Sequence, residues 1–343
     1  VYTINGLPLS NLVFLFFTLL DPALAPMITD IFFIVYVTNL NSYNIYDKQL
    51  IMKKIKLGNK VISNESSCYL IAEIGINHNG DLDNVIKLID NSKNAGFDCV
   101  KFQKRTPEIS TPDSQKHVMR ETPWGEMTYL DYKKRIELNK EAYNAIDLHC
   151  KDIGIDWTAS CWDIPSVEFI ENYNVPFIKI ASACLTDKDL ISKIKDTKKP
   201  IILSTGMSTM DEIKKAVDLL SESELILLHT TSSYPCPPEE LNLKMIETLK
   251  YKFPELIIGY SGHEVGLAST LAAVTLGAKI VERHITLSRA MWGTDQSASI
   301  EISGMTKLVK DLRTIESSLG DGVKKVYDSE KNPLQKLRLK NTL

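Results

Sequence analysis

Two histidines near the end of the chain stand where chemistry could occur. His263 lies in the stretch YSGHEVG and His284 in VERHIT, and each stretch closes an apolar run that reads as a buried strand. If the two strands are neighbours, both imidazoles can converge on one ion. Two histidines with water, and a carboxylate as a further ligand, suit Mn²⁺, Zn²⁺ or Fe²⁺, and such an ion would polarise a carbonyl as a Lewis acid. Two hydrogen-bonded core histidines are the structural alternative.

Two lysines lie inside apolar runs, which is an unusual position for a charged side chain. Lys101 lies in VKF and Lys179 in IKI. A buried ammonium group is unfavourable unless an anion neutralises it, so the pair indicates one shared anion. Strand-end hydroxyls such as Ser204 and Ser261 would complete a phosphate site together with helix N-termini, although a single such serine is more often a helix N-cap. We therefore expect a phosphate-bearing substrate.

Glu73 lies in the first apolar run, in the stretch IAEIG, at a position suited to a general base. A glutamate within a strand can instead simply pair with a neighbouring lysine. The combination of a carboxylate, two lysines and two imidazoles at strand ends is harder to explain by structural roles alone. It favours an enzyme.

The elements that would carry these groups alternate regularly from residue 69 onward. Eight short apolar runs are each followed by a stretch with helical period, which is typical of βα units around a parallel sheet. Eight units over roughly 250 residues fit a (β/α)8 TIM barrel, in which catalytic groups lie at the C-terminal ends of the strands. The runs are Tyr69–Gly75, Cys99–Gln103, Asp156–Ser160, Phe177–Ala181, Ile201–Thr205, Leu225–Thr230, Leu256–Ser261 and Lys279–Ile285.

An open doubly wound sheet is the alternative fold. It would typically carry a Gly-rich phosphate turn after its first strand, but residues 75–80 (GINHNG) do not fit GxGxxG. A long segment at residues 104–138 follows the second run. We interpret it as a substrate lid, because it is too long for a simple connection. Thr209 with Glu212 predicts a capping box at the start of the helix after the fifth run.

Composition narrows the class of protein. The chain has 343 residues, of which 44% are hydrophobic and 24% are charged, as expected for one large α/β domain with an appendage or for two smaller domains. A net charge of −3 argues against a nucleic-acid or membrane-surface partner. The six cysteines include no CxxC pair, so we expect buried thiols in a reducing, cytoplasmic setting rather than disulfides or zinc ligands.

Residues 1–51 differ from the rest of the chain. They are strongly apolar, but residues 21–30 contain two aspartates and two prolines, whereas a spanning helix needs about 20 mostly apolar residues. No basic residue precedes position 48, unlike in a signal peptide. We predict a poorly defined apolar extension, to which we assign no function, upstream of a barrel domain at residues 52–343. A membrane anchor and an ordered extra element are the alternatives.

Eight motifs, in order along the chain, resemble one family. They are IAEIGINHNGDL, VKFQ, FIKIAS, ILSTGMS, HTTSSYPCP, GYSGH, VERHIT and GTDQSAS. Over about residues 60–330 they resemble the sialic acid synthases, which condense phosphoenolpyruvate with an N-acylated amino hexose. The resemblance implies a TIM-barrel transferase that joins phosphoenolpyruvate to N-acetylmannosamine and water and forms N-acetylneuraminate and phosphate.

The resemblance also implies roles for individual residues. His263 and His284 match the ligands of a divalent ion, usually Mn²⁺ or Mg²⁺, that polarises the open-chain aldehyde of the sugar. Glu73 matches the catalytic glutamate, and Lys101 and Lys179 match groups that hold phosphoenolpyruvate. The remaining candidate substrate-binding residues are Gln103, Ser182, Ser204, Ser232, Tyr234, Ser261, Arg283 and Asp295.

Three departures from the family pattern bear on sugar recognition. Cys184 stands where many members carry an acidic residue, and Ser232 stands where asparagine is common. The chain ends at Leu343, soon after VKKVYDSEKNPLQKLR, and we expect it to lack the antifreeze-like C-terminal (SAF) domain that typically covers a partner's active site. The resemblance implies a homodimer, with no nucleic-acid partner and no stable membrane association.

The choice of sugar stays open at this point. Legionaminate, pseudaminate and sialate 9-phosphate synthases are alternatives. A 6-phosphorylated hexosamine would need a further cationic pocket, for which Lys133, Lys134 and Arg135 are candidates. A metal-dependent hydrolase on the same barrel is less favoured, because NHN follows the first run where such enzymes carry HxH. A binding protein without turnover is also less favoured, because binding alone does not need the glutamate, both lysines and both histidines.

Overall fold

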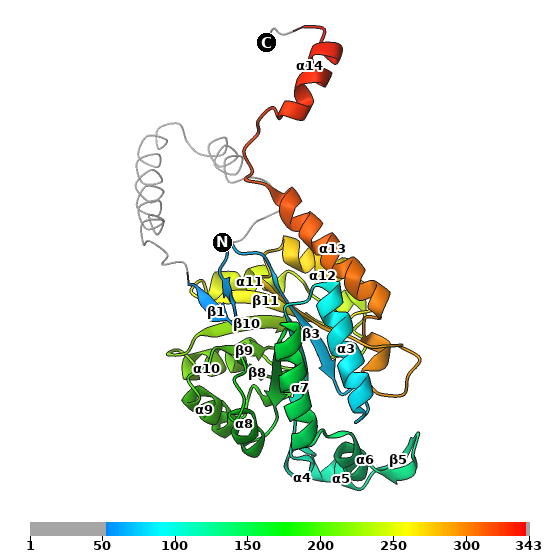
Figure 1. The fold of residues 1–343 in the computed structure, drawn as a ribbon. Coiled ribbons are helices and arrows are strands. Elements are labelled where there is room, and N and C mark those ends of the chain that lie inside the picture. The colour runs from blue at the N-terminus through cyan, green and yellow to red at the C-terminus, as the bar shows by residue number, and fades with distance from the viewer. Residues whose placement is uncertain (1–52, 341–343) are drawn as a thin grey trace, which may run out of the picture. The chain divides into compact units, whose positions relative to one another are not determined.

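Eight parallel strands close into a barrel in the computed structural model, which describes residues 53–340 (Figure 1). Each strand pairs with its neighbours in chain order, and the last strand pairs with the first, so the barrel has no open edge. The (β/α)8 prediction is thereby confirmed, and the open doubly wound alternative is wrong. The strands are β3 (Tyr69–Gly75), β4 (Cys99–Lys104), β7 (Asp156–Cys161), β8 (Ile178–Ile180), β9 (Ile201–Ser204), β10 (Leu225–Thr230), β11 (Ile257–Gly262) and β12 (Ile280–His284).

Helices alternate with the strands and cover the barrel from outside (Figure 1). In α3 (Leu82–Ala95), Asp81 caps the N-terminus by accepting a backbone N–H, and Gly96 ends the helix in the left-handed conformation. The predicted capping box of Thr209 and Glu212 is present at the start of α10 (Met210–Leu219). The other helices around the barrel are α7 (Lys140–Ile153), α8 (Ile164–Ile170), α9 (Lys188–Asp196), α11 (Met245–Lys252), α12 (Ala268–Thr275) and α13 (Ile302–Leu319). A further helix, α14 (Lys331–Leu337), follows α13 in the chain.

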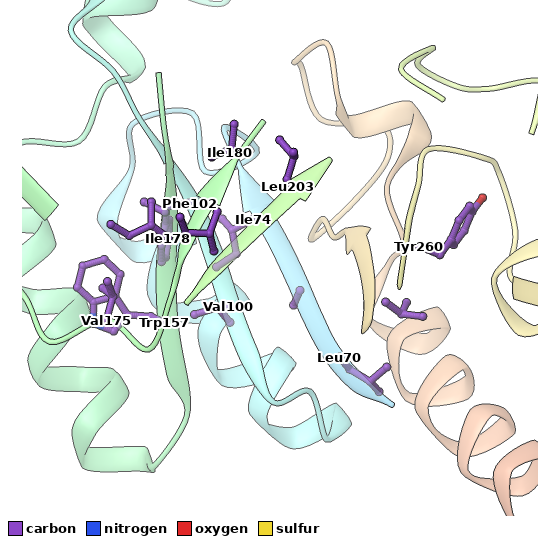
Figure 2. Packing of buried hydrophobic residues seen from close by; sticks show 14 of the residues in the cluster. Leu70, Ile74, Val100, Phe102, Trp157, Val175, Ile178, Ile180, Leu203 and Tyr260 are labelled. Carbon is purple, nitrogen blue, oxygen red and sulfur yellow. The ribbon is translucent and has the colours of Figure 1, made fainter. Parts of the chain in front are cut away.

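Alternation along each strand decides which side chains face the barrel interior. Leu70, Val100 and Phe102 belong to the large apolar cluster between the strands and the helices (Figure 2). The alternate residues Tyr69 and Ile71 belong to a separate cluster inside the barrel. The side chain of every second residue in a strand therefore points into the barrel, whether it is polar or apolar.

A short hairpin fills the N-terminal end of the barrel interior. Its strands are β1 (Ile55–Leu57) and β2 (Lys60–Ile62), and their buried side chains join the cluster that contains Ile71, Ile202 and Ile226. Burying these apolar groups at one end leaves the C-terminal ends of the strands as the place for polar residues that point inward. The fold thus concentrates the chemistry at one mouth of the barrel.

The segment at residues 104–138 forms a small substructure between β4 and α7. A cluster of Ile76, Tyr132 and Ile136 anchors it to the loop after β3. Its elements are α4 (Pro107–Ser110), α5 (Asp113–Lys116), β5 (Met119–Thr122), β6 (Gly125–Thr128) and α6 (Tyr129–Ile136). The segment is ordered around its own apolar contacts, and its interpretation as a lid stays a prediction.

Two expectations from composition can be compared with the structure. All six cysteines lie in the described part of the chain, and all are buried and unpaired, as predicted. No helix among residues 53–340 is both long enough and apolar enough to span a bilayer. The expectations for residues 1–51 fall outside the residues that the structure describes.

Candidate active site

A pocket, here called the cup, opens at the C-terminal ends of the barrel strands. Every predicted site residue except Arg283 and Asp295 lines it. All eight barrel strands, or the loops that follow them, contribute polar groups to it. These are Glu73, Lys101, Gln103, Ser160, Lys179, Ser182, Ser204, Thr230, Ser232, Tyr234, Ser261, His263, Glu282 and His284.

The floor of the cup is a network of buried charges. Lys101 Nζ lies 2.7 Å from Glu73 Oε2 and 3.6 Å from Glu282 Oε1, and it donates a hydrogen bond of 2.7 Å to Ser160 Oγ. Lys179 Nζ lies 4.0 Å from Glu282 Oε1. Both lysines are only 2% exposed, so their ammonium groups are desolvated and held in place. Both point into the barrel, as the sequence predicts.

Burial sets the protonation of these groups. Desolvation raises the pKa of Glu73 to about 7, with Lys101 acting in the opposite direction. Burial lowers the pKa of Lys179 to about 8. Burial also acts to lower the pKa of Lys101, but Glu282 and Glu73 outweigh it and raise that pKa. Glu73 is therefore the carboxylate in this network that exchanges a proton near neutral pH.

The two histidines face each other on one side of the cup. Their ring centroids are 5.4 Å apart. The carbonyl of Thr231 accepts a hydrogen bond of 2.8 Å from His263 Nδ1, which assigns the proton to Nδ1 and leaves the Nε2 lone pair free to bind. Nδ1 of His284 is buried without a hydrogen-bond partner among the described residues and lies 3.8 Å from Asp295 Oδ2.

This donor set fits a divalent metal ion. Burial lowers the pKa of His263 to about 4 and also lowers that of His284, so both imidazoles are neutral at pH 7, which is the form that binds metals. Within residues 53–340 no cluster of three or more His, Cys, Asp or Glu side chains is arranged to hold a metal. The pair therefore offers two protein ligands, and the other positions around an ion would be open to water or substrate oxygens.

Polar and aromatic groups border the histidine side of the cup. The Tyr234 ring lies 4.2 Å from the His263 ring and 5.8 Å from the His284 ring, measured between centroids. Ser232 Oγ is buried without a hydrogen-bond partner among the described residues. Gln103 Nε2 donates to Glu73 Oε1 at 3.0 Å, and this bond connects the histidine side with the charged floor.

Gly206 allows two loops to meet at the mouth of the cup. Its N–H donates a hydrogen bond of 3.0 Å to Ser182 Oγ. A Cβ at position 206 would lie 2.1 Å from Ser232 Oγ and 2.8 Å from Ser182 Oγ, which real side chains do not tolerate. The glycine of the STGMS stretch is therefore needed to bring Ser182 and Ser232 to the same wall.

A family model described as the NeuB family matches residues 88–324. The chain belongs to the NeuB family. Human N-acetylneuraminate-9-phosphate synthase is 37% identical over 278 residues, which cover 78% of this chain and 76% of that protein. N,N'-diacetyllegionaminic acid synthase from Campylobacter jejuni is 37% identical over 276 residues, which cover 78% of this chain and 82% of that protein. The resemblance seen in the sequence motifs is confirmed.

A solved structure gives the same fold. The crystal structure of N-acetylneuraminic acid synthetase from Leptospira borgpetersenii, in complex with citrate, superposes on this NeuB chain with a TM-score of 0.74 and 31% identity. The match covers 84% of this chain and 99% of that one. The barrel of this NeuB chain is therefore of the same type as that synthetase.

The structure does not bring Arg283 to the cup, so the prediction that it binds substrate is wrong. The guanidinium points outward and forms a buried ion pair with Glu264, with 2.9 Å between Nη1 and Oε1. It also donates to the Gly266 carbonyl at 3.0 Å and to the Thr270 hydroxyl. Arg283 lies between Glu282 and His284 on β12. Successive side chains of a strand point to opposite faces, so Glu282 and His284 face the barrel interior and Arg283 faces the helix layer.

Replacing Arg283 by leucine is expected to lower the free energy of unfolding by about 3–5 kcal/mol, because the Glu264 carboxylate would remain buried with the hydroxyl donors Tyr260 and Thr270 but without a cation. The measurement is urea unfolding followed by circular dichroism. Arg289→Leu is the control, because its ion pair with Glu301 is 3.7 Å long and half exposed, and we expect a change below about 1 kcal/mol. An unchanged unfolding midpoint for Arg283→Leu would contradict this structural role.

Glu282, Ser160 and Trp162 also line the cup, but they are not among the site residues predicted from the sequence. Glu282 could have been predicted from the sequence, because it stands two residues before His284 and its side chain therefore points to the same face of the strand. Ser160 is the last inward residue of its predicted strand, and the same alternation would have identified it. Trp162 lies beyond the end of β7, where no strand periodicity applies.

Proposed function

We propose that the chain is a nonulosonate synthase of the sialic acid type, which joins phosphoenolpyruvate to an N-acyl hexosamine such as N-acetylmannosamine. The observation that carries the proposal is the convergence in one cup of two buried lysines, a carboxylate with a pKa of about 7 and two imidazoles 5.4 Å apart. The lysines suit an enol phosphate, the carboxylate suits a proton transfer, and the two imidazoles suit an ion that polarises an aldehyde. NeuB relatives named as N-acetylneuraminate-9-phosphate and legionaminic acid synthases support it.

Lys101 and Lys179 are assigned to the anionic groups of phosphoenolpyruvate. Lys179 Nζ donates to Ser204 Oγ at 2.7 Å, so its position is set before substrate arrives. The hydroxyls of Ser182 and Ser261 line the same pocket and can donate to phosphate oxygens. Cations fixed in a site without bulk water stabilise the negative charge that grows on the departing phosphate.

The reaction assigned to the cup makes one carbon–carbon bond and breaks one carbon–oxygen bond. C3 of phosphoenolpyruvate bonds to the aldehyde carbon of the sugar, water adds at C2, and the C2–O bond to phosphate breaks. The aldehyde oxygen gains a proton and the attacking water loses one. Glu73 is assigned as the base that takes the proton from the attacking water, because a carboxyl group with a pKa of about 7 can both accept and release a proton near neutral pH. Gln103 orients this carboxylate through the bond of 3.0 Å.

The sugar is assigned to the histidine side of the cup. His263 and His284 would hold a divalent ion, Mn²⁺ or Mg²⁺, which as a Lewis acid polarises a carbonyl oxygen. Tyr234 and Ser232 line this side, and Asp295 lies next to His284. Their hydroxyl and carboxylate groups are suited to the hydroxyls and the N-acyl group of the acceptor.

Phosphate release is the test of this function. With Mn²⁺ present, the protein should release inorganic phosphate only when phosphoenolpyruvate and an N-acyl hexosamine are added together, and mass spectrometry should find the nine-carbon product. Each substrate alone is the control. Phosphate release from phosphoenolpyruvate alone would favour the hydrolase alternative, and no release with any hexosamine would contradict the synthase.

The Michaelis constant for phosphoenolpyruvate should depend on pH through Lys179. Because the pKa of this lysine is lowered to about 8, its ammonium group is charged below that pH and neutral above it. The KM for phosphoenolpyruvate is expected to rise above pH 8 by up to about tenfold per pH unit, while the KM for the hexosamine stays nearly constant. In Lys179→Arg the side chain stays charged, so this rise should disappear. A KM of the unmodified protein that does not change with pH would contradict the assignment.

A further inference from the structure

The pairing between β11 and β12 ends one position before the two histidines of the cup. The last paired residues are Gly262 on β11 and Arg283 on β12. His263 follows the last residue of β11, and His284 is the last residue of β12. Contacts beyond the paired part of the two strands must therefore help to hold the two imidazoles at their spacing.

Each histidine is held to a neighbour on its far side. His284 pairs with Glu73 of β3, and the His284 carbonyl accepts a hydrogen bond of 2.8 Å from the Ile300 N–H. The His263 carbonyl accepts a hydrogen bond of 3.0 Å from the Cys236 N–H, and His263 Nδ1 donates to the same loop after β10. Because these bonds connect the histidines to different parts of the barrel, they do not fix the distance between the two rings.

The side chain of Arg283 joins the two strand ends on the outer face of the barrel. Its Nη2 donates to the Glu264 carbonyl at 2.6 Å, and its Nη1 donates to the Gly266 carbonyl at 3.0 Å. Its Nη1 also donates to Glu264 Oε1 at 2.9 Å. A planar guanidinium presents several donors in a fixed geometry, which a lysine ammonium does not. One side chain of β12 therefore holds the main chain that directly follows His263.

The Glu264 carboxylate is fixed in turn by its own donors. Tyr260, which belongs to the apolar cluster outside the barrel (Figure 2), donates to Glu264 Oε2 at 2.8 Å. The Thr270 hydroxyl donates to Glu264 Oε1 at 2.7 Å. A Cβ at position 262 would collide with Glu264 Oε2, so the glycine of the YSGH stretch lets the carboxylate lie this close to the strand. Glu264 and Arg283 are both buried, so neither side chain can move without breaking several bonds.

We propose that the Glu264–Arg283 ion pair positions the metal site: it fixes the separation of His263 and His284, and its loss weakens the binding of a divalent ion. Each member of the pair is adjacent in sequence to one histidine. Because successive side chains alternate between faces, the ion pair lies outside the barrel where the imidazoles lie inside it. The inference rests on the proposed function, since it concerns the ion that the histidines would hold.

A site with two imidazoles is sensitive to their spacing. The ring centroids are 5.4 Å apart, and no third His, Cys, Asp or Glu among residues 53–340 completes a metal-binding cluster with them. Functional sites tolerate displacements of only about 0.5 Å. A change that lets one strand end move would therefore leave the ion with one imidazole. Residues that support metal ligands from behind commonly change metal affinity by about 10- to 100-fold.

The test is titration of Mn²⁺ followed by electron paramagnetic resonance, with Arg283→Lys and Glu264→Gln compared with the unmodified protein. Arg283→Lys keeps a cation beside the Glu264 carboxylate but loses the fork that reaches the two carbonyls. Glu264→Gln keeps the size of the side chain but loses its charge. We expect the dissociation constant for Mn²⁺ to rise about tenfold in each variant. In the double variant the rise should stay well below the product of the two single rises, because both changes remove the same link.

A stability control separates positioning from a general loss of stability. Ile170→Ala removes a buried side chain of α8, which connects β7 to β8 on the far side of the barrel from β11 and β12. It should lower the midpoint of urea unfolding at least as much as Arg283→Lys does, yet leave the Mn²⁺ dissociation constant unchanged. Circular dichroism checks that each variant is folded during the titration. Excess Mn²⁺ should restore most of the phosphate release of Arg283→Lys by mass action.

The outcomes distinguish this inference from the proposed function. If folded Arg283→Lys and Glu264→Gln bind Mn²⁺ as tightly as the unmodified protein, the positioning role is overturned and the histidine site stands. An equal loss of Mn²⁺ affinity in Ile170→Ala would overturn it as well, because the effect would then follow stability. If the unmodified protein binds no Mn²⁺, the metal assignment of the histidine pair fails, and the positioning role fails with it. The synthase function is tested separately, by phosphate release from both substrates.

Discussion

Replacing Glu73 by glutamine is expected to lower kcat by about 10³-fold, because the amide cannot take the proton of the attacking water. The substitution keeps the volume of a side chain that is 1% exposed. Lys101 also retains Glu282 at 3.6 Å, so the charged floor keeps one carboxylate. The KM for phosphoenolpyruvate should therefore change by less than about threefold, since binding by the lysines is preserved. Steady-state phosphate release with both substrates measures the two constants.

Glu126→Gln is the matched control for this substitution, because Glu126 is exposed on β6 of the insertion. It should leave both constants unchanged. If the kcat of Glu73→Gln is within about tenfold of that of the unmodified protein, Glu73 is not the base in the proton transfer. If the unmodified protein binds phosphoenolpyruvate but never converts it, the result would favour the alternative of a binding protein without turnover.

Replacing His263 by alanine is expected to lower kcat/KM by about 10²-fold or more and to abolish the response to added Mn²⁺. One of the two neutral imidazoles would be missing, and no third His, Cys, Asp or Glu among residues 53–340 completes a metal-binding cluster that could compensate. Chelation of the unmodified protein should have the same effect, with activity restored by Mn²⁺. Titration of Mn²⁺ followed by electron paramagnetic resonance measures binding apart from turnover.

The control histidine is His149, which is paired with Asp90 at 2.7 Å on the helical layer. His149→Ala should leave the Mn²⁺ response unchanged. If His263→Ala binds Mn²⁺ as tightly as the unmodified protein, the histidine pair is not the metal site. Activity that survives complete chelation would likewise contradict a role for the ion.

Local sequence determined the parts of this protein that depend on near neighbours. The predicted run Tyr69–Gly75 coincides with β3, and the pair Thr209 and Glu212 forms its capping box, because alternation and capping involve residues only a few positions apart. The order of eight such units also determined the barrel, since each βα unit packs beside the one before it. Lys101 and Lys179 could be assigned to the interior because each stands between two apolar residues that face the helices.

Tertiary structure alone decided which polar side chains meet. Arg283 and Glu282 are adjacent in the chain, yet one is paired with Glu264 outside the barrel and the other lies with Lys101 inside it. Likewise nothing in the string KKR at residues 133–135 distinguishes Lys133, which reaches a cavity beside Arg105, from Lys134, which reaches Glu108. The physical reason is that charge compensation depends on distances between segments far apart in sequence, and these distances exist only after the barrel closes and the insertion packs.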